Sequence, residues 1–169
     1  MLSGINHTFY HGTSYSPASD AWPGRLFYAA VHLNSRNSLW NDFPKLNHYT
    51  ARCQSFLQTT KADNDVLLYY PIYDRFSAPG PEMVEHFDGI GGFTGSGFER
   101  IAEEMLEKGF AFDYVSDKQL NETILDESSL KTAGNRRYKV IVVPECDYMP
   151  LATLEKLHSI AERGATIIF

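Results

Sequence analysis

The sequence of 169 residues lacks three features that would each assign it to a class of protein. No run of eighteen apolar residues is present, and the first residues lack the basic and apolar stretches of a secretory leader. The sequence therefore predicts neither a membrane span nor a signal sequence. Lysine and arginine form no cluster, and the formal net charge is −6. Nucleic acid is not an expected partner, because binding to phosphates requires a basic surface.

Cysteine is scarce as well. Cys53 and Cys146 lie far apart without a C-x-x-C spacing, which predicts two free thiols and no zinc site or disulfide framework. Cys146 follows a predicted strand, as the nucleophile of some hydrolase folds does. However, Pro144 and Tyr148 stand where a nucleophile elbow requires small residues. We therefore interpret Cys146 as a structural thiol.

The stretch that organises the chain is residues 65–74, DVLLYYPIYD. Its apolar run ends at Pro71 and predicts a strand buried on both faces, as in a parallel sheet covered by helices. Strands and helices then alternate; we predict strands over 112–115, 138–143 and 165–169 and helices over 98–108 and 151–163. With right-handed crossovers, this pattern predicts a flavodoxin-like three-layer α/β fold with a parallel sheet of order about 2-1-3-4.

Residues 1–62 follow a different pattern, so we place a domain boundary before residue 63. Residues 4–12 have the composition of a strand, 13–42 form a long aromatic connection, and 44–60 have apolar residues at helical spacing. Because predicted strands stand at both ends of the chain, we expect a piece of a longer polypeptide. Its cut strand edges would allow a homodimer.

Two segments remain without regular structure in this prediction. Residues 119–134 indicate a short helix and a loop, and 75–97 indicate a long loop ending in several glycines. These glycines do not fit G-x-G-x-x-G, and Phe98 stands where a phosphate-binding loop requires lysine. The spacing therefore favours a lid or packing loop over a nucleotide site.

His7 and His11 share one side of the predicted strand over 4–12. Two histidines could bind a metal, but no third ligand is evident. Two interpretations stay open: hydrogen bonding to a polyol together with Asn6, or a polar strand end whose histidines have ordinary partners.

Several stretches together resemble the α-L-rhamnosidases of glycoside hydrolase family 106. The most specific is G-x-N-x-x-x-Y-H-G-T-x-Y-S-P over residues 4–17. Trp22-Pro23-Gly24, Asn34-x-Arg36-Asn37-x-Leu39-Trp40 and Tyr69-Tyr70-Pro71-Ile72-Tyr73-Asp74 extend the resemblance along nearly the whole chain.

The resemblance implies that residues 1–62 are the last strand, loop and helix of a (β/α)8 barrel, a remnant of the catalytic domain. Residues 63–169 would then begin a class I amidotransferase-like accessory domain. The parent enzyme would be bacterial, periplasmic or secreted, inverting and calcium-assisted, with plant-type or bacterial rhamnose-containing glycans as substrates.

Inversion requires two carboxyl groups, and residues 1–19 contain none. The resemblance therefore implies no catalytic residue and no cofactor in this chain, which would be inactive alone. It implies substrate contacts only, from Asn6, His7, His11 and Trp22.

An alternative is a self-sufficient flavodoxin-like module that binds a small molecule. Its ligand would lie at the carboxyl ends of the strands, near Tyr73, Asp74, Asp117 and Glu145.

Overall fold

The computed structural model describes residues 5–77 and 91–169. The chain divides into two compact units, Met1–Ala62 and Asp63–Phe169, which we call unit 1 and unit 2. Within the described ranges, no helix is long and apolar enough to cross a membrane.

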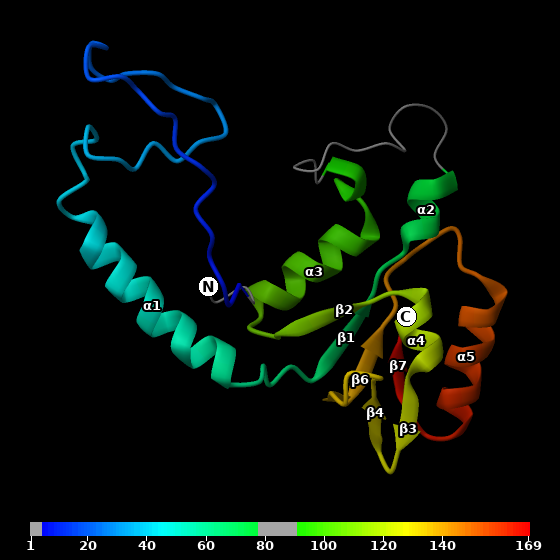
Figure 1. Ribbon diagram of the computed structural model, residues 1–169. Helices are drawn as coiled ribbons and strands as arrows, with labels where there is room; N and C mark the ends of the chain where they lie inside the picture. Colours follow the sequence, from blue (N-terminus) through cyan, green and yellow to red (C-terminus); the bar gives the residue numbers. More distant parts are fainter. Residues whose placement is uncertain (1–4, 78–90) are drawn as a thin grey trace. The chain divides into compact units, whose positions relative to one another are not determined.

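Unit 1 contains one helix, α1 (Phe43–Thr59), which is preceded by a long irregular connection (Figure 1). Pro44 stands in its first turn, where the missing N–H of proline costs nothing. The helix lies where the apolar spacing predicts it. However, no residue between 5 and 62 is buried, and Leu46, Tyr49 and Phe56 of the predicted apolar face are exposed. Unit 1 therefore has an amphipathic helix without a hydrophobic core.

The predicted strand over 4–12 is wrong for residues 5–12, which have no regular structure and pair with no strand among the described residues. A strand requires a neighbouring strand for its backbone groups. Here side chains of α1 serve instead: Gln54 Oε1 accepts from Thr8 N, and Gln58 Nε2 donates to Asn6 O at 3.0 Å.

Unit 2 is built on a parallel four-stranded sheet. The strands are β1 (Val66–Tyr69), β2 (Phe112–Val115), β6 (Val140–Val142) and β7 (Thr166–Ile168), in the order β2-β1-β6-β7. β1 pairs with β2 and β6, and all four residues of β1 are buried. The prediction of a central, doubly buried strand is therefore confirmed for residues 66–69, while Tyr70 lies beyond the strand and is half-buried.

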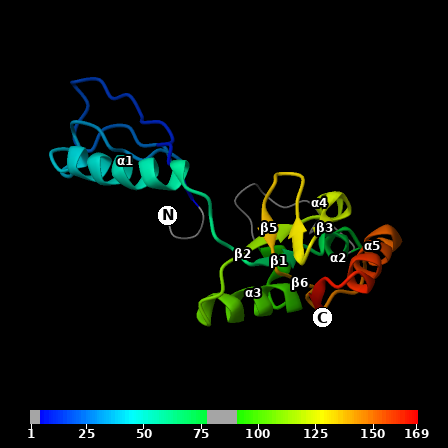
Figure 2. The same cartoon turned by 90° about the horizontal axis from the view of Figure 1, so that it is seen from below.

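Helices cover both faces of this sheet (Figure 2). α3 (Gly97–Glu107) packs Phe98, Ala102 and Met105 against Val66 and Leu68. On the opposite face, Leu67 and Tyr69 pack with residues of α4 (Asp117–Glu122) and α5 (Leu151–Glu162), among them Leu120, Leu157 and Ile160. Each fully buried leucine here is worth roughly 2–5 kcal/mol against alanine.

A second, antiparallel sheet was not predicted. It contains β3 (Ile124–Asp126), β4 (Ser129–Lys131) and β5 (Arg137–Tyr138), in that order. The predicted strand 138–143 is consequently two strands: β5 pairs with β4, and β6 pairs with β1 after a bend at Lys139. Lys139 fixes this bend, because both its N–H and its Nζ donate to Asp65 at 2.8 Å.

The predicted loop over 75–97 also needs correction. The helix α2 (Ile72–Ser77) begins directly after Pro71, and a short 3-10 helix, η2 (Gly91–Phe93), precedes α3. Residues 78–90, which include part of the glycine-rich stretch, lie outside the described residues. Gly97 lies against Glu145, and a Cβ at Gly97 would come within 2.9 Å of the Glu145 Cβ. This glycine therefore permits close packing.

Candidate functional site

The segment over residues 5–12 is held along α1 by polar contacts. Besides the two bonds to Thr8 and Asn6, the Tyr10 hydroxyl donates to Asn47 Oδ1 at 2.7 Å, and its ring lies 5.0 Å from that of Phe43. Tyr10 therefore points toward α1. The rings of His7 and Phe9 lie 4.2 Å apart, so these two side chains share a side of the segment, as their spacing predicts.

The predicted site residues of this segment are exposed. The hydrogen bond between Asn6 and Gln58 is made by the backbone carbonyl of Asn6, so the Asn6 side-chain amide takes no part in it. His7 and His11 are both exposed. Among the described residues, no group of three or more His, Cys, Asp or Glu side chains is arranged to hold a metal ion.

Trp22 is presented by a loop that is organised around Arg36. The Trp22 Nε1 donates to Arg36 O at 3.1 Å, while 74% of the residue is exposed. The Arg36 guanidinium donates to the backbone oxygens of Pro17 and Asp20. Several hydrogen bonds thus fix the base of the loop and leave the indole face open to solvent.

The turn after Trp22 depends on a glycine. The Trp22–Pro23 peptide bond is cis, and Gly24 has a φ of +87°. A Cβ at Gly24 would come within 2.5 Å of Ser16 Oγ and 3.0 Å of Arg36 Nη1. Only glycine tolerates both the positive φ and the close approach of these side-chain atoms without strain.

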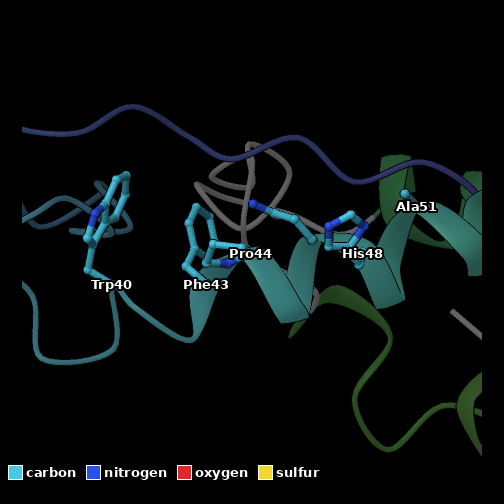
Figure 3. Close-up of a pocket in the computed structure, with 6 residues that line it drawn as sticks. Trp40, Phe43, Pro44, His48 and Ala51 are labelled. Carbon is cyan, nitrogen blue, oxygen red and sulfur yellow. The ribbon is translucent and has the colours of Figure 1, made fainter.

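Described residues of unit 1 line three hollows. The smallest, about 80 Å³, is beside Trp22 and is lined also by His32, Asn34 and Arg36. Another, about 260 Å³, lies beside Tyr10, Gly12 and Thr13. The largest of the three, about 450 Å³, lies at the start of α1 (Figure 3). Its lining includes Trp40, Phe43, Asn47 and His48.

The structure therefore brings together only part of the predicted site. Trp22 lines the smallest hollow, but Asn6, His7 and His11 line none of the three. Sequence reasoning missed Asn34, Arg36, Trp40 and Asn47 as site candidates. A signal for the first three was present, since they belong to the motif Asn34-x-Arg36-Asn37-x-Leu39-Trp40.

Unit 1 contains two carboxylates, Asp20 and Asp42. Asp20 Oδ2 lies 3.2 Å from Arg25 Nε, and Asp42 Oδ1 lies 3.0 Å from Lys45 Nζ. Both are surface ion pairs between sequence neighbours. Neither has the desolvated surroundings that prepare a carboxyl group for general acid catalysis.

The carboxylates at the carboxyl ends of the strands in unit 2 have structural partners. Asp74 accepts from the backbone N–H groups of Asp147 and Tyr148, and Glu145 pairs with Arg100 at 3.3 Å. Asp117 Oδ1 accepts from the hydroxyl of Tyr69. These bonds occupy three of the residues predicted for a ligand site in the stand-alone alternative.

Cys146 lies at the same end of the sheet. Burial raises the pKa of its thiol, and the carboxylates of Asp74, Asp147 and Asp117 raise it further. A raised pKa lowers the thiolate fraction at neutral pH, which is the opposite of what a nucleophile requires. This supports the interpretation of Cys146 as a structural thiol.

Comparison with known proteins places this α/β chain among the glycoside hydrolases. The sequence model of the family described as alpha-L-rhamnosidase matches residues 1–168, so the chain belongs to the α-L-rhamnosidase family, glycoside hydrolase family 106.

Two relatives are much longer than this chain. The structure of a rhamnosidase from Novosphingobium sp. PP1Y matches 97% of the chain with a TM-score of 0.66 at 23% identity, which supports the fold. A protein of Formosa agariphila named "Putative beta-glucuronidase" is 25% identical over 166 residues, 98% of the chain. The chain spans 14% of the former and 12% of the latter.

Proposed function

We propose that this chain is part of a glycoside hydrolase that cleaves α-L-rhamnosides of plant-type or bacterial glycans with inversion at the anomeric carbon. The observation that carries the proposal is the match of the α-L-rhamnosidase family to residues 1–168. The small share of each relative that the chain covers supports a longer parent polypeptide.

Unit 1 is proposed to be the last strand, loop and helix of a (β/α)8 barrel. Its exposed apolar residues support this, because an amphipathic helix without a core requires a neighbouring surface to cover it. Residues 5–12 would pair with barrel strands outside this chain, and 13–42 would lie at the carboxyl face, where barrel sites are found.

In this arrangement Asn6, His7, His11 and Trp22 contact the substrate but do not catalyse. The open indole face of Trp22 suits stacking against a sugar ring, and the Asn6 amide and the histidines can bond hydroxyl groups. The ion pairs of Asp20 and Asp42 support placing the catalytic acid and base outside the chain, which would then be inactive alone.

Unit 2 is proposed to be a flavodoxin-like, class I amidotransferase-like accessory domain. Its parallel sheet with helices on both faces supports this. The raised pKa of Cys146 supports a domain without amidotransferase chemistry.

The described residues do not fit a calcium site, since they hold no suitable group of three ligands and both carboxylates of unit 1 are paired with cations. We therefore derive no step through calcium from this chain. A calcium ion in the parent enzyme would bind residues elsewhere.

The isolated chain is proposed to form a homodimer through a strand edge. β7 is an outer strand of the sheet, and Ile168 and Phe169 at its end are 52% and 80% exposed. Light scattering coupled to size-exclusion chromatography should give the mass of a dimer for the unchanged chain. Ile168→Lys should shift this mass toward that of a monomer, whereas Leu46→Lys on α1 should leave it unchanged. A monomer at every concentration would remove this part of the proposal.

Kinetics of the longer polypeptide test the substrate class. We expect hydrolysis of an aryl α-L-rhamnoside and none of an aryl β-D-glucuronide; the reverse would favour the activity in the name of the Formosa agariphila relative. Trp22→Ala should raise KM about tenfold with little change in kcat, because stacking binds ground and transition states alike. Tyr28→Ala, an exposed aromatic of the same loop, is the matched control.

A further inference from the structure

A hollow on unit 2 is lined by none of the residues Tyr73, Asp74, Asp117 and Glu145 discussed above. It is a cavity of about 600 Å³ bounded by β2, by α4 and by the turn over residues 132–136. Its floor includes Leu67 and Val115, which are 2% and 1% exposed. Leu67 belongs to the central strand β1 and Val115 to the outer strand β2, and the two strands pair over four residues, which holds this floor in place. The volume lies within the range of small-molecule sites, roughly 300–1,000 Å³.

One wall carries a fixed acceptor. Asp113 points to the same face as Val115, and its Oδ2 accepts from the Tyr138 hydroxyl at 2.7 Å. This bond orients the carboxylate while its second oxygen, Oδ1, takes no part in it. Burial and the bond to Asp113 raise the pKa of Tyr138 to about 12, so the phenol keeps its proton and the orientation persists at physiological pH.

The α4 side of the lining carries an exposed amide that its own helix orients. Gln119 lies in α4, and its Oε1 accepts from both the N–H and the hydroxyl of Ser116 in a capping box. The oxygen of the amide is thereby turned to Ser116, so its Nε2 forms the free end of the side chain. Glu122, one turn further along α4, adds an exposed carboxylate to the lining.

The charges of the lining select against an anion. Asp113 and Glu122 are acidic, and Arg136 is the basic residue among those that line the cavity. A phosphate or carboxylate ligand would meet two negative groups and one positive group. A hydroxyl group, in contrast, both donates and accepts, so it can bond the Asp113 carboxylate and the Gln119 amide.

We propose that this cavity between β2, α4 and the 132–136 turn is a binding site for one neutral saccharide unit, carried by unit 2 independently of the substrate contacts of unit 1. Orienting bonds for Asp113 and Gln119 exist before the ligand arrives, so little side-chain order is lost on binding. Because the cavity is open and its contacts are polar, we expect a Kd on the order of 1 mM.

Titration of the ¹⁵N-labelled 169-residue chain with methyl α-L-rhamnoside and methyl α-D-glucoside tests the proposal by NMR. At least one glycoside should produce saturable shifts of the Gln119 side-chain amide and of the Asp113 and Gly134 backbone amides. Saturable shifts with inorganic phosphate in place of a glycoside, shifts confined to other elements, or no saturable shift would each overturn it.

Two variants sharpen the test. Glu122→Gln should weaken binding about tenfold, as expected for a lost charged hydrogen bond, whereas Glu103→Gln on α3 makes the same change of charge and should leave the Kd unchanged. Gly134→Phe should abolish binding by filling the mouth; a Cβ at Gly134 meets no atom closer than 3.9 Å, so the backbone accepts it. Equal effects of the two glutamate variants, or undiminished binding by Gly134→Phe with its amide spectrum otherwise intact, would contradict the proposal.

Discussion

The hydroxyl of Tyr69 donates a hydrogen bond of 2.8 Å to Asp117 Oδ1, which joins the last residue of β1 to the first residue of α4. Thr153 Oγ1 of α5 donates to the same oxygen at 2.6 Å. Tyr69 and Thr153 are both fully buried. One carboxylate therefore ties the central strand to two helices at the carboxyl end of the sheet.

Removal of this hydroxyl should destabilise unit 2. We expect Tyr69→Phe to lower the free energy of unfolding by about 1–3 kcal/mol, because the half-buried carboxylate of Asp117 loses one of its donors. Urea unfolding followed by circular dichroism measures the change. Tyr114→Phe, at an exposed tyrosine of β2, is the control and should change the free energy of unfolding by less than about 0.5 kcal/mol.

A double-mutant cycle tests the shared acceptor. The effects of Tyr69→Phe and Thr153→Val on the free energy of unfolding should not be additive, since both side chains donate to Asp117. Strict additivity would contradict the shared bond.

The two buried phenols predict a loss of stability at alkaline pH. Burial and the bond to Asp113 raise the pKa of Tyr138 from 10.0 to about 12, and burial together with Asp117 raises the pKa of Tyr69. A raised pKa means that the folded state binds the proton more tightly. Its contribution is therefore complete below pH 10 and is lost as the pH rises through about 12.

Thermal unfolding between pH 8 and pH 12 should show this decline, with tyrosinate absorbance appearing in step. Tyr138→Phe should make the fall between pH 10 and 12 less steep, since it removes one of the linked ionisations. An unchanged slope would contradict the assignment.

Cys146 should react slowly with thiol reagents. Burial and neighbouring carboxylates raise its pKa, so a Cys53→Ser variant should be alkylated by iodoacetamide more slowly than a peptide cysteine at pH 8. Asp74→Asn should accelerate the reaction, because it removes a negative charge and keeps an acceptor for Tyr148 N. A rate above that of the peptide would argue for an activated thiol.

Arg36 should control the order of the Trp22 loop. Arg36→Ala removes the guanidinium bonds to Pro17 and Asp20, and we expect the Trp22 indole N–H to exchange with solvent about tenfold faster. Hydrogen exchange by NMR resolves this N–H from that of Trp40. Arg52→Ala, an exposed arginine of α1, is the matched control and should leave the rate unchanged.

The regular elements of unit 2 could be predicted because their burial follows sequence periodicity. The run at Val66 to Tyr69 is apolar on both faces and became the central strand, and Phe98, Ala102 and Met105 lie on one face of α3. Ser96 caps α3 through a contact that is equally local, since its hydroxyl accepts from Glu99 N.

The antiparallel sheet gave weaker signals. The turn between β3 and β4 places Glu127 at a φ of +57°, a conformation for which glycine or asparagine is the usual sign. The next turn did carry such a sign, Gly134-Asn135, with Asn135 at +60°. Pro71 likewise marks the start of α2, although its position after β1 suggested only the end of the strand.

The candidate site could be predicted only residue by residue. Trp22 was identified from its motif, but its tie to Arg36 joins residues fourteen positions apart within an irregular loop, where no periodicity applies. The strand predicted over 4–12 failed for a related reason: composition gives the tendency to form a strand, while a strand also needs a partner.

The most direct test of the account compares two forms of the protein in one assay. An aryl α-L-rhamnoside is supplied to the isolated 169-residue chain and, in parallel, to the longer polypeptide that contains it, and release of the aryl alcohol is measured. The account predicts hydrolysis by the longer polypeptide and none by the chain alone. Hydrolysis by the chain alone would contradict it, because carboxyl groups of this chain would then have to supply the acid and base.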